Sequence, residues 1–237
     1  MGQIEIFEDA EALSRAAASF FVQASHRALE RVGRFSVALS GGSGPKRMFE
    51  LLATDEYWRA VPWDRTHLFW GDDRAVGPEH ELSNYLLAQE AFIHAVPIPE
   101  DNVHRIKGEL GAQTAAEDYA RELMNFFGGE TAPSFDLALQ GMGGDGHTAS
   151  LFPGDDALTA TNYVAPVFDP PAAPHVDRVT LTYPAFAGSH TALFLVAGPA
   201  KRDVLASVLG GDEQYPAARF RAHQVLWFLD KAAAGEE

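Results

Sequence analysis

The sequence contains no cysteine, which excludes disulfide bonds, thiolate catalysis and metal ligation through sulfur. It also has no apolar run near the roughly 18 residues that a membrane-spanning helix requires. Its first stretch, "MGQIEIFEDAEAL", carries acidic residues where a signal peptide begins with basic ones. These absences lead us to expect a cytoplasmic protein without membrane segments.

Positive charge is scarce as well. The 237 residues include 18 Lys and Arg against 33 Asp and Glu, and the net charge is −15. Such a chain repels the phosphates of nucleic acids and anionic lipids, so we expect neither as a partner. With 46% hydrophobic residues the chain can bury a sizeable core. We therefore expect a single domain over residues 1–237, present as a monomer or a weak homo-oligomer.

Short apolar runs alternate along the chain with longer amphipathic ones, and several of the short runs are apolar at consecutive positions. Consecutive apolar residues are typical of strands buried on both faces of a parallel sheet. The pattern therefore predicts an α/β fold, a three-layer sandwich whose mostly parallel sheet has helices on both faces. The expected strands are 4–7, 35–40, 67–70, 103–106, 135–140, 163–168, 178–183, 191–198 and 224–230, and the expected helices are 9–32, a helix starting at Pro45, 83–95, 114–127 and 200–209.

Four of the expected strands end in unusually polar or glycine-rich segments, namely "SGGSGPK", "GDDR", "GMGGDGH" and "GPAK". In an open α/β sheet, ligands bind beyond the carboxyl ends of the strands, so these segments converge on one edge. The sequence therefore predicts a ligand site at that edge.

The first of these segments suits an anion. Its glycines, among them Gly41 and Gly42, precede a helix, and the backbone N–H groups of such a loop and helix start can surround a phosphate. The spacing is not that of a P-loop, and a tight turn would need the same glycines. Phosphate binding by Gly41, Gly42 and Ser43 is the functional interpretation.

Cations follow two other strands. Arg74 in "WGDDR" offers a planar fork to phosphate or carboxylate, and Asp72 can hold a hydroxyl or a neighbouring cation, although a solvated ion pair would look the same. Lys201, one of only four lysines, stands where a helix is expected to begin. A helix N-terminus disfavours a cation, so this position favours an anionic ligand nearby.

The segment "GMGGDGHTASLFPG" matches the dinucleotide pattern GxGxxG, but Pro153 and Gly154 interrupt the helix that such a site requires. Neither Ser43 nor Ser150 lies in a GxSxG nucleophile motif. The histidines lack metal-ligand spacing, so we expect no metal site. The remaining interpretation is His147 as a general acid or base, with Asp145 orienting its ring.

Taken together, "SGGSGP", "WGDDR", "SNY", "GMGGDGHTASLFPG", "RVTLT" and "GPAK" resemble the 6-phosphogluconolactonases, a family that shares its fold with glucosamine-6-phosphate deaminases. The resemblance runs from about residue 35 to the closing "VLWFLD". It implies a modified Rossmann-like α/β sandwich. It also implies hydrolysis of 6-phosphogluconolactone, a small phosphosugar lactone, to 6-phosphogluconate in the oxidative pentose phosphate pathway, without cofactor or metal.

The same resemblance assigns roles to residues. It implies that His147 is the general base that activates water and that Asp145 supports it. The segment Gly41–Ser43, Arg74 and Lys201 are implied to bind the phosphate, with Asp72 and Asn84 close to the substrate and Arg178 as a further neighbour.

One position departs from the family, because Gly44 stands where relatives usually carry threonine, and a hydroxyl is lost.

Two other functions stay open. A deaminase or sugar-phosphate isomerase would resemble "GxDGHIAFNEP", with a glutamate after the histidine, whereas here "TASLFPG" has no acid before Asp155. A non-catalytic sugar-phosphate-binding module would need cations and amides but no poised base. Both points favour lactone hydrolysis.

Overall fold

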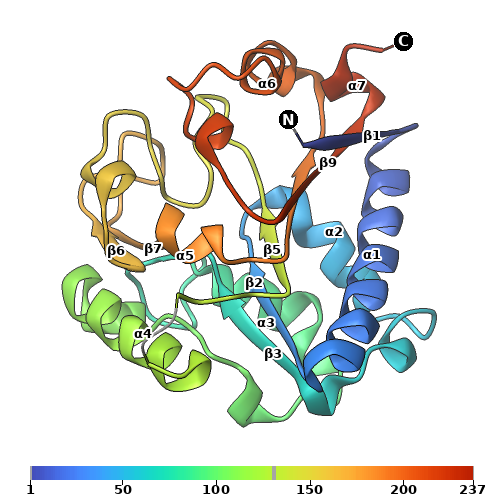
Figure 1. Cartoon of the computed structure of the whole chain (residues 1–237), viewed down its shortest axis with the longest axis vertical. Helices are drawn as coiled ribbons and strands as arrows, with labels where there is room; N and C mark the ends of the chain where they lie inside the picture. The colour runs from blue at the N-terminus through green and yellow to red at the C-terminus, as the bar shows by residue number, and fades with distance from the viewer. Residues whose placement is uncertain (1, 130–131, 237) are drawn as a thin grey trace.

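The computed structural model describes residues 2–129 and 132–236. Strands and helices alternate along most of the chain, as Figure 1 shows. The strands are β1 (Gln3–Phe7), β2 (Phe35–Leu39), β3 (Thr66–Trp70), β4 (Asp72–Arg74), β5 (Leu137–Gln140), β6 (Val164–Val167), β7 (Arg178–Leu181), β8 (Thr191–Val196) and β9 (Gln224–Asp230). The helices are α1 (Ala10–Val32), α2 (Ser43–Leu52), α3 (Asn84–Ala91), α4 (Ala112–Phe127), α5 (Tyr183–Ala187), α6 (Arg202–Leu209) and α7 (Lys231–Ala234).

The main sheet has six strands in the order β1-β9-β8-β5-β2-β3, and every neighbouring pair is parallel. All residues of β2 and β5 are buried, as their continuous apolar sequences predict. The expected α/β fold with a mostly parallel sheet is confirmed. Among the described residues, no helix is long and apolar enough to cross a membrane.

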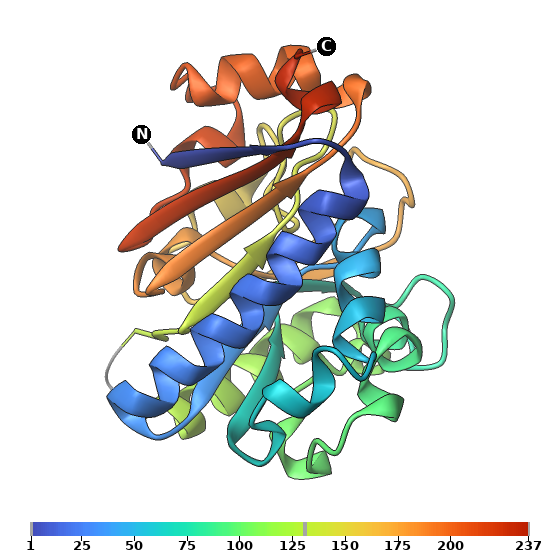
Figure 2. The ribbon, with the colours of Figure 1, turned by 90° about the vertical axis from the view of Figure 1, so that its right-hand side faces the viewer.

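Helices cover both faces of this sheet. On one face α1 lies across the strands beside α2, and Phe21 of α1 packs edge-on against Phe35 of β2 with ring centroids 5.2 Å apart (Figure 2). On the other face α4 covers β3, where Phe126 packs against Phe69 at 4.9 Å. These apolar contacts hold the sheet rigidly, so the loops at its carboxyl edge have a firm base.

Local sequence signals mark both ends of α1 and the start of α3. Asp9 caps α1 by accepting a hydrogen bond from the backbone N–H of Ala12 at 2.8 Å, and Gly33 ends it at φ 75°. Ser83 caps α3 by accepting from the N–H of Leu86 at 3.2 Å. The entry into α3 matters because its first residue lies in the candidate site.

A second, antiparallel sheet with the order β4-β7-β6 is a feature that the sequence did not predict. The segment Asp72–Arg74 was expected to be a loop, yet it pairs with β7. Three residues that are all charged carry no strand signal of their own, so the pairing comes from the neighbouring strand. The N–H of Leu181 donates to the carbonyl of Gly71 at 2.8 Å and so joins this sheet to the end of β3.

Other expectations were wrong in part, and the expected strand 178–183 ends at Leu181, because Tyr183 begins α5. Residues 103–106 form no strand, because Val103 makes only an isolated bridge to Leu68. Helix α2 begins at Ser43 rather than Pro45, and α3 ends at Ala91, before the expected residue 95. A segment of only four residues does not distinguish a strand from an extended segment that runs beside a strand. This ambiguity explains the error at residues 103–106.

Candidate active site

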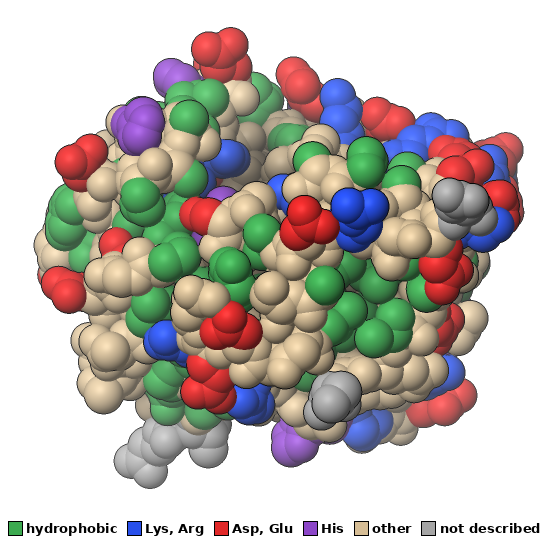
Figure 3. Space-filling model, turned by 90° about the horizontal axis from the view of Figure 1, so that it is seen from above, with side chains coloured by type: hydrophobic (Ala, Val, Ile, Leu, Met, Phe, Trp, Pro, Cys, Tyr) green, Lys and Arg blue, Asp and Glu red, His purple; other side chains and the backbone are tan. Residues whose placement is uncertain are grey.

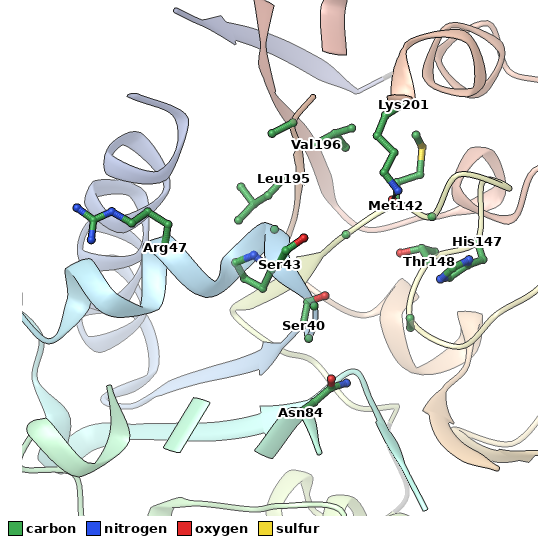
Figure 4. Close-up of a pocket in the computed structure, with 18 of the residues that line it drawn as sticks. Ser40, Ser43, Arg47, Asn84, Met142, His147, Thr148, Leu195, Val196 and Lys201 are labelled. Atoms are coloured by element: carbon green, nitrogen blue, oxygen red, sulfur yellow. Dashed lines mark hydrogen bonds between the residues drawn. The ribbon is translucent and has the colours of Figure 1, made fainter. Parts of the chain in front are cut away.

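A cleft of about 490 Å³ lies at the carboxyl edge of the main sheet, and segments after five of its strands line it. Ser43, at the start of α2, lies in the middle of the close-up, with Lys201 and His147 on one side and Asn84 on another (Figure 4). The cleft brings together the predicted residues Gly41, Gly42, Ser43, Asp72, Arg74, Asn84, His147, Arg178 and Lys201. Asp145 does not line the cleft but contacts His147, which does.

The loop after β2 can exist only with glycine at two positions. A Cβ atom on Gly41 would lie 1.8 Å from Asn84 Oδ1, and Gly42 has a φ of 79°. Gly42 is the N-cap of α2 and makes no side-chain capping bond, so the first N–H groups of the helix are directed at the cleft. The partial positive charge of this helix start suits an anion.

The loop after β5 carries an aspartate–histidine pair. His147 Nδ1 lies 2.5 Å from Asp145 Oδ1, and the same oxygen accepts the backbone N–H of His147 at 3.1 Å. Burial raises the pKa of Asp145, but the hydrogen bonds from the ring and backbone of His147 and the charge of His147 together outweigh it and bring that pKa to about 2. The carboxylate is therefore ionised at neutral pH. When Nδ1 donates to it, Nε2 is the nitrogen left to accept a proton.

Two neighbours fix the ring of His147. A Cβ atom on Gly143 would lie 2.1 Å from Nδ1 of His147, so only glycine lets the ring pass. On its other side the ring packs against Phe152, with centroids 4.5 Å apart. The glycines of this loop thus provide room for the histidine.

Three cations of the cleft have no ion pair with any described carboxylate. Arg74 donates to the carbonyl of Leu82 at 3.2 Å and to Asn84 Oδ1. Lys201 Nζ donates to the carbonyl of Met142 at 2.8 Å. Arg178 donates only to backbone carbonyls, and burial lowers its pKa. In the view from above, basic and histidine side chains lie in a hollow whose surroundings carry acidic ones (Figure 3).

Asp72 also lines the cleft, and its side chain is largely buried, with the residue 5% exposed. Its Oδ2 accepts the hydroxyl of Ser150 at 2.7 Å, and its carbonyl accepts Asn84 Nδ2 at 2.9 Å. The hydroxyl that Asp72 holds in the structure belongs to Ser150, a partner the sequence did not indicate, and its predicted place beside the substrate stays a prediction.

The sequence reading missed Asp73. Its carboxylate accepts the N–H groups of Asn84 at 2.6 Å and Tyr85 at 3.0 Å, and so docks the start of α3 beside the cleft. Burial raises the pKa of Asp73 to about 6. The sequence offered one indication of this contact, Ser83 at the N-cap of α3, whose hydroxyl also donates to Asp73 at 3.2 Å.

Arg47 was also missed, and it differs from the other cations. It lines the far end of the cleft but is ion-paired with Glu11, the Nε–Oε2 distance being 2.7 Å. No group of three or more His, Asp or Glu side chains gathers as a metal site within the described ranges.

A parallel sheet whose carboxyl edge opens into a polar cleft, with a histidine oriented by a carboxylate, defines an α/β enzyme. Residues 8–227 match the family model described as Glucosamine-6-phosphate isomerases/6-phosphogluconolactonase. A Nostoc sp. protein named 6-phosphogluconolactonase is 37% identical, and the match covers 98% of this chain and 97% of that protein.

Solved structures agree. The crystal structure of 6-phosphogluconolactonase from Thermotoga maritima matches with a TM-score of 0.85 and 32% identity, covering 97% of this chain and 99% of that one. A monomeric glucosamine-6-phosphate deaminase has a TM-score of 0.81 at 17% identity, covers 99% of this chain and 100% of its own, and shares the fold. The chain belongs to the glucosamine-6-phosphate isomerase/6-phosphogluconolactonase family.

Proposed function

We propose that the protein is a 6-phosphogluconolactonase, which hydrolyses 6-phosphogluconolactone to 6-phosphogluconate. The observation that carries the proposal is the Asp145–His147 pair facing a cleft whose cations Arg74, Arg178 and Lys201 have no described carboxylate partner. The names of relatives that match nearly the whole chain support it. A cleft of about 490 Å³ is of the size that small-molecule sites have, roughly 300–1,000 Å³.

The chemistry needs one base that later becomes an acid. His147 Nε2 takes a proton from a water molecule while the water oxygen attacks the lactone carbonyl carbon. The tetrahedral intermediate then collapses, the bond from that carbon to the ring oxygen breaks, and the protonated His147 returns its proton to the ring oxygen. Asp145 holds the ring in one orientation and stabilises its positive charge between the two steps.

The anionic group of the substrate is bound by the amide and cationic groups of the cleft. The N–H groups of Gly41–Ser43 at the start of α2, together with Arg74, Arg178 and Lys201, hold the phosphate. Phosphate binding fixes the sugar so that its carbonyl carbon stays near His147. The water that His147 activates then attacks a carbon that is already in position.

The deaminase function has less support. The shared fold does not separate the two activities, whereas the segment after His147 does. The first acid there, Asp155, accepts the N–H of Ala157 at 2.8 Å and does not line the cleft. The segment directly after His147 therefore offers no carboxylate in the place of the glutamate that a deaminase of this family is expected to use.

A direct assay tests the proposal. Freshly prepared 6-phosphogluconolactone is incubated with the protein and acid release is followed in a pH-stat, with spontaneous hydrolysis subtracted and glucosamine 6-phosphate as the parallel substrate. We expect acid release from the lactone alone. Ammonia release from the amino sugar would reverse the assignment, and no acceleration of either reaction would favour the binding module. The cytoplasmic location, the single domain, the monomeric or weakly associated state and the independence from cofactor and metal stay predictions.

A further inference from the structure

The turn that follows His147 is strained. Ala149, which lines the cleft, has a φ of 49°, a left-handed conformation that residues other than glycine rarely adopt. Such strain persists only where the surroundings hold the backbone in place. On one side of Ala149 the hydroxyl of Thr148 donates to Gln140 Oε1 at 2.7 Å, and both side chains are buried.

On the other side Ser150 holds the turn. Its side chain is fully buried and does not line the cleft. Its hydroxyl donates to Asp72 Oδ2 at 2.7 Å, and its N–H donates to Thr180 Oγ1 at 3.2 Å. Asn84 Nδ2 donates to Asp72 Oδ1 at 3.4 Å, and Asn84 Oδ1 accepts from Arg74. A continuous series of hydrogen bonds thus runs from the loop that carries His147 to Asn84 and Arg74, which form the cationic wall of the cleft.

We propose that Ser150 is a positioning residue for His147. Through Asp72 it holds the histidine loop against the wall formed by Asn84 and Arg74, so that the base and the phosphate-binding cation keep one separation. The inference rests on the proposed function. A displacement of a base by about 1 Å can lower the rate about 10²-fold. Because one substrate contacts both the base and the phosphate-binding cation, the distance between these two groups has to stay fixed.

A merely structural hydroxyl would have different consequences. Losing it would lower the free energy of unfolding and loosen both ends of the cleft together. A positioning hydroxyl affects proton transfer and leaves the cationic wall intact. The turnover number kcat and the inhibition constant of inorganic phosphate, which probes the wall alone, therefore separate the two roles.

The chain offers a matched control for this substitution. Ser189 is also fully buried, and its hydroxyl has no hydrogen-bond partner among the described residues. Ser189→Ala removes the same atom from the interior without touching the site. Ser150→Ala and Ser189→Ala are therefore compared in kcat and KM for 6-phosphogluconolactone, in phosphate inhibition and in thermal unfolding.

We expect Ser150→Ala to lose about 10-fold or more in kcat, with KM and the phosphate inhibition constant within about two-fold of wild type, while Ser189→Ala keeps its kcat. A kcat of Ser150→Ala within about two-fold of wild type would overturn the proposal, as would a parallel loss of phosphate binding. Should Ser150→Ala fail to fold, Ser150→Cys keeps the volume with a weak donor and is judged by the same criteria.

The wild-type assay separates this inference from the proposed function. A wild type that hydrolyses the lactone, with an unimpaired Ser150→Ala variant, leaves the function standing and removes only the positioning role. A wild type inactive on the lactone overturns both.

Discussion

Arg74 and Arg178 stand directly opposite each other on the antiparallel strands β4 and β7. Both line the cleft, and the Nε atom of each is buried without a hydrogen-bond partner among the described residues. Like charges at opposite positions of a strand pair destabilise the sheet, and an anion bound between them removes the repulsion. This cationic pair supports the proposal that the cleft binds the phosphate of the substrate.

Arg74→Ala is expected to weaken affinity for the phosphorylated lactone by roughly 1.5–3 kcal/mol, the usual range for a hydrogen bond to a charged group, or about 10–100-fold in KM. Lys201→Ala is expected to behave in the same way. KM is measured on 6-phosphogluconolactone and on gluconolactone without phosphate. The control is Arg202→Ala, because Arg202 is exposed and ion-paired with Asp203. Equal losses on both lactones would contradict the phosphate assignment.

His147→Ala is expected to lower kcat by about 10²–10⁴-fold, the usual scale for a general base, with little change in KM. The reason is that the ring accepts the proton but does not hold the phosphate. His94→Ala is the matched control, since His94 is exposed and away from the cleft. Steady-state kinetics decide the matter, and unchanged turnover in His147→Ala would remove the mechanism.

Gly44→Thr is expected to tighten phosphate binding by a few-fold, since it adds a hydroxyl to the first turn of α2. The structure has room for it, because a Cβ at this position would meet only the carbonyl of Leu195, at 3.6 Å. Gly44→Val matches the shape without the hydroxyl. The inhibition constant of inorganic phosphate is compared between the two variants, and identical values would show that the hydroxyl contributes nothing.

As the pH is lowered from about 6.5 to about 4, the free energy of unfolding is expected to fall, partly because of His67. Burial lowers the pKa of His67 to about 4, helped by His104 and Arg34 nearby. In this window the unfolded state binds more protons at this residue than the folded state, so its contribution to the free energy of unfolding rises with pH. His67→Gln removes that dependence.

Melting temperatures at about pH 5 and pH 7.5 test this expectation. The drop from neutral to acidic pH should be a few degrees smaller in His67→Gln than in wild type. The exposed His94 again provides the control, as His94→Gln should keep the wild-type dependence. An unchanged drop in His67→Gln would show that other groups dominate the acid instability.

Features that depend on neighbouring residues were readable from the sequence. The runs "FSVAL" and "LALQ" became fully buried parallel strands, and Ser83 caps the helix that it precedes. Asp145 and His147 are two residues apart, so their contact is set by one short loop. Helix caps, buried strands and such loop contacts depend on local sequence, which is why the fold class followed from it and why His147 could be proposed as the base.

Pairings between distant segments were decided only by the tertiary structure. Ser150 and Asp72 are 78 positions apart, and Arg74 meets Arg178 only because β4 and β7 pair in one register. Neither contact has a local signal, since a charged three-residue strand and a buried serine are unremarkable in sequence. By itself the sequence determined an α/β protein with a histidine loop after one buried strand and a glycine-rich loop after another. The pairing of β4 with β7 and the packing of the core decided how those loops are spaced, because register and burial depend on distant segments.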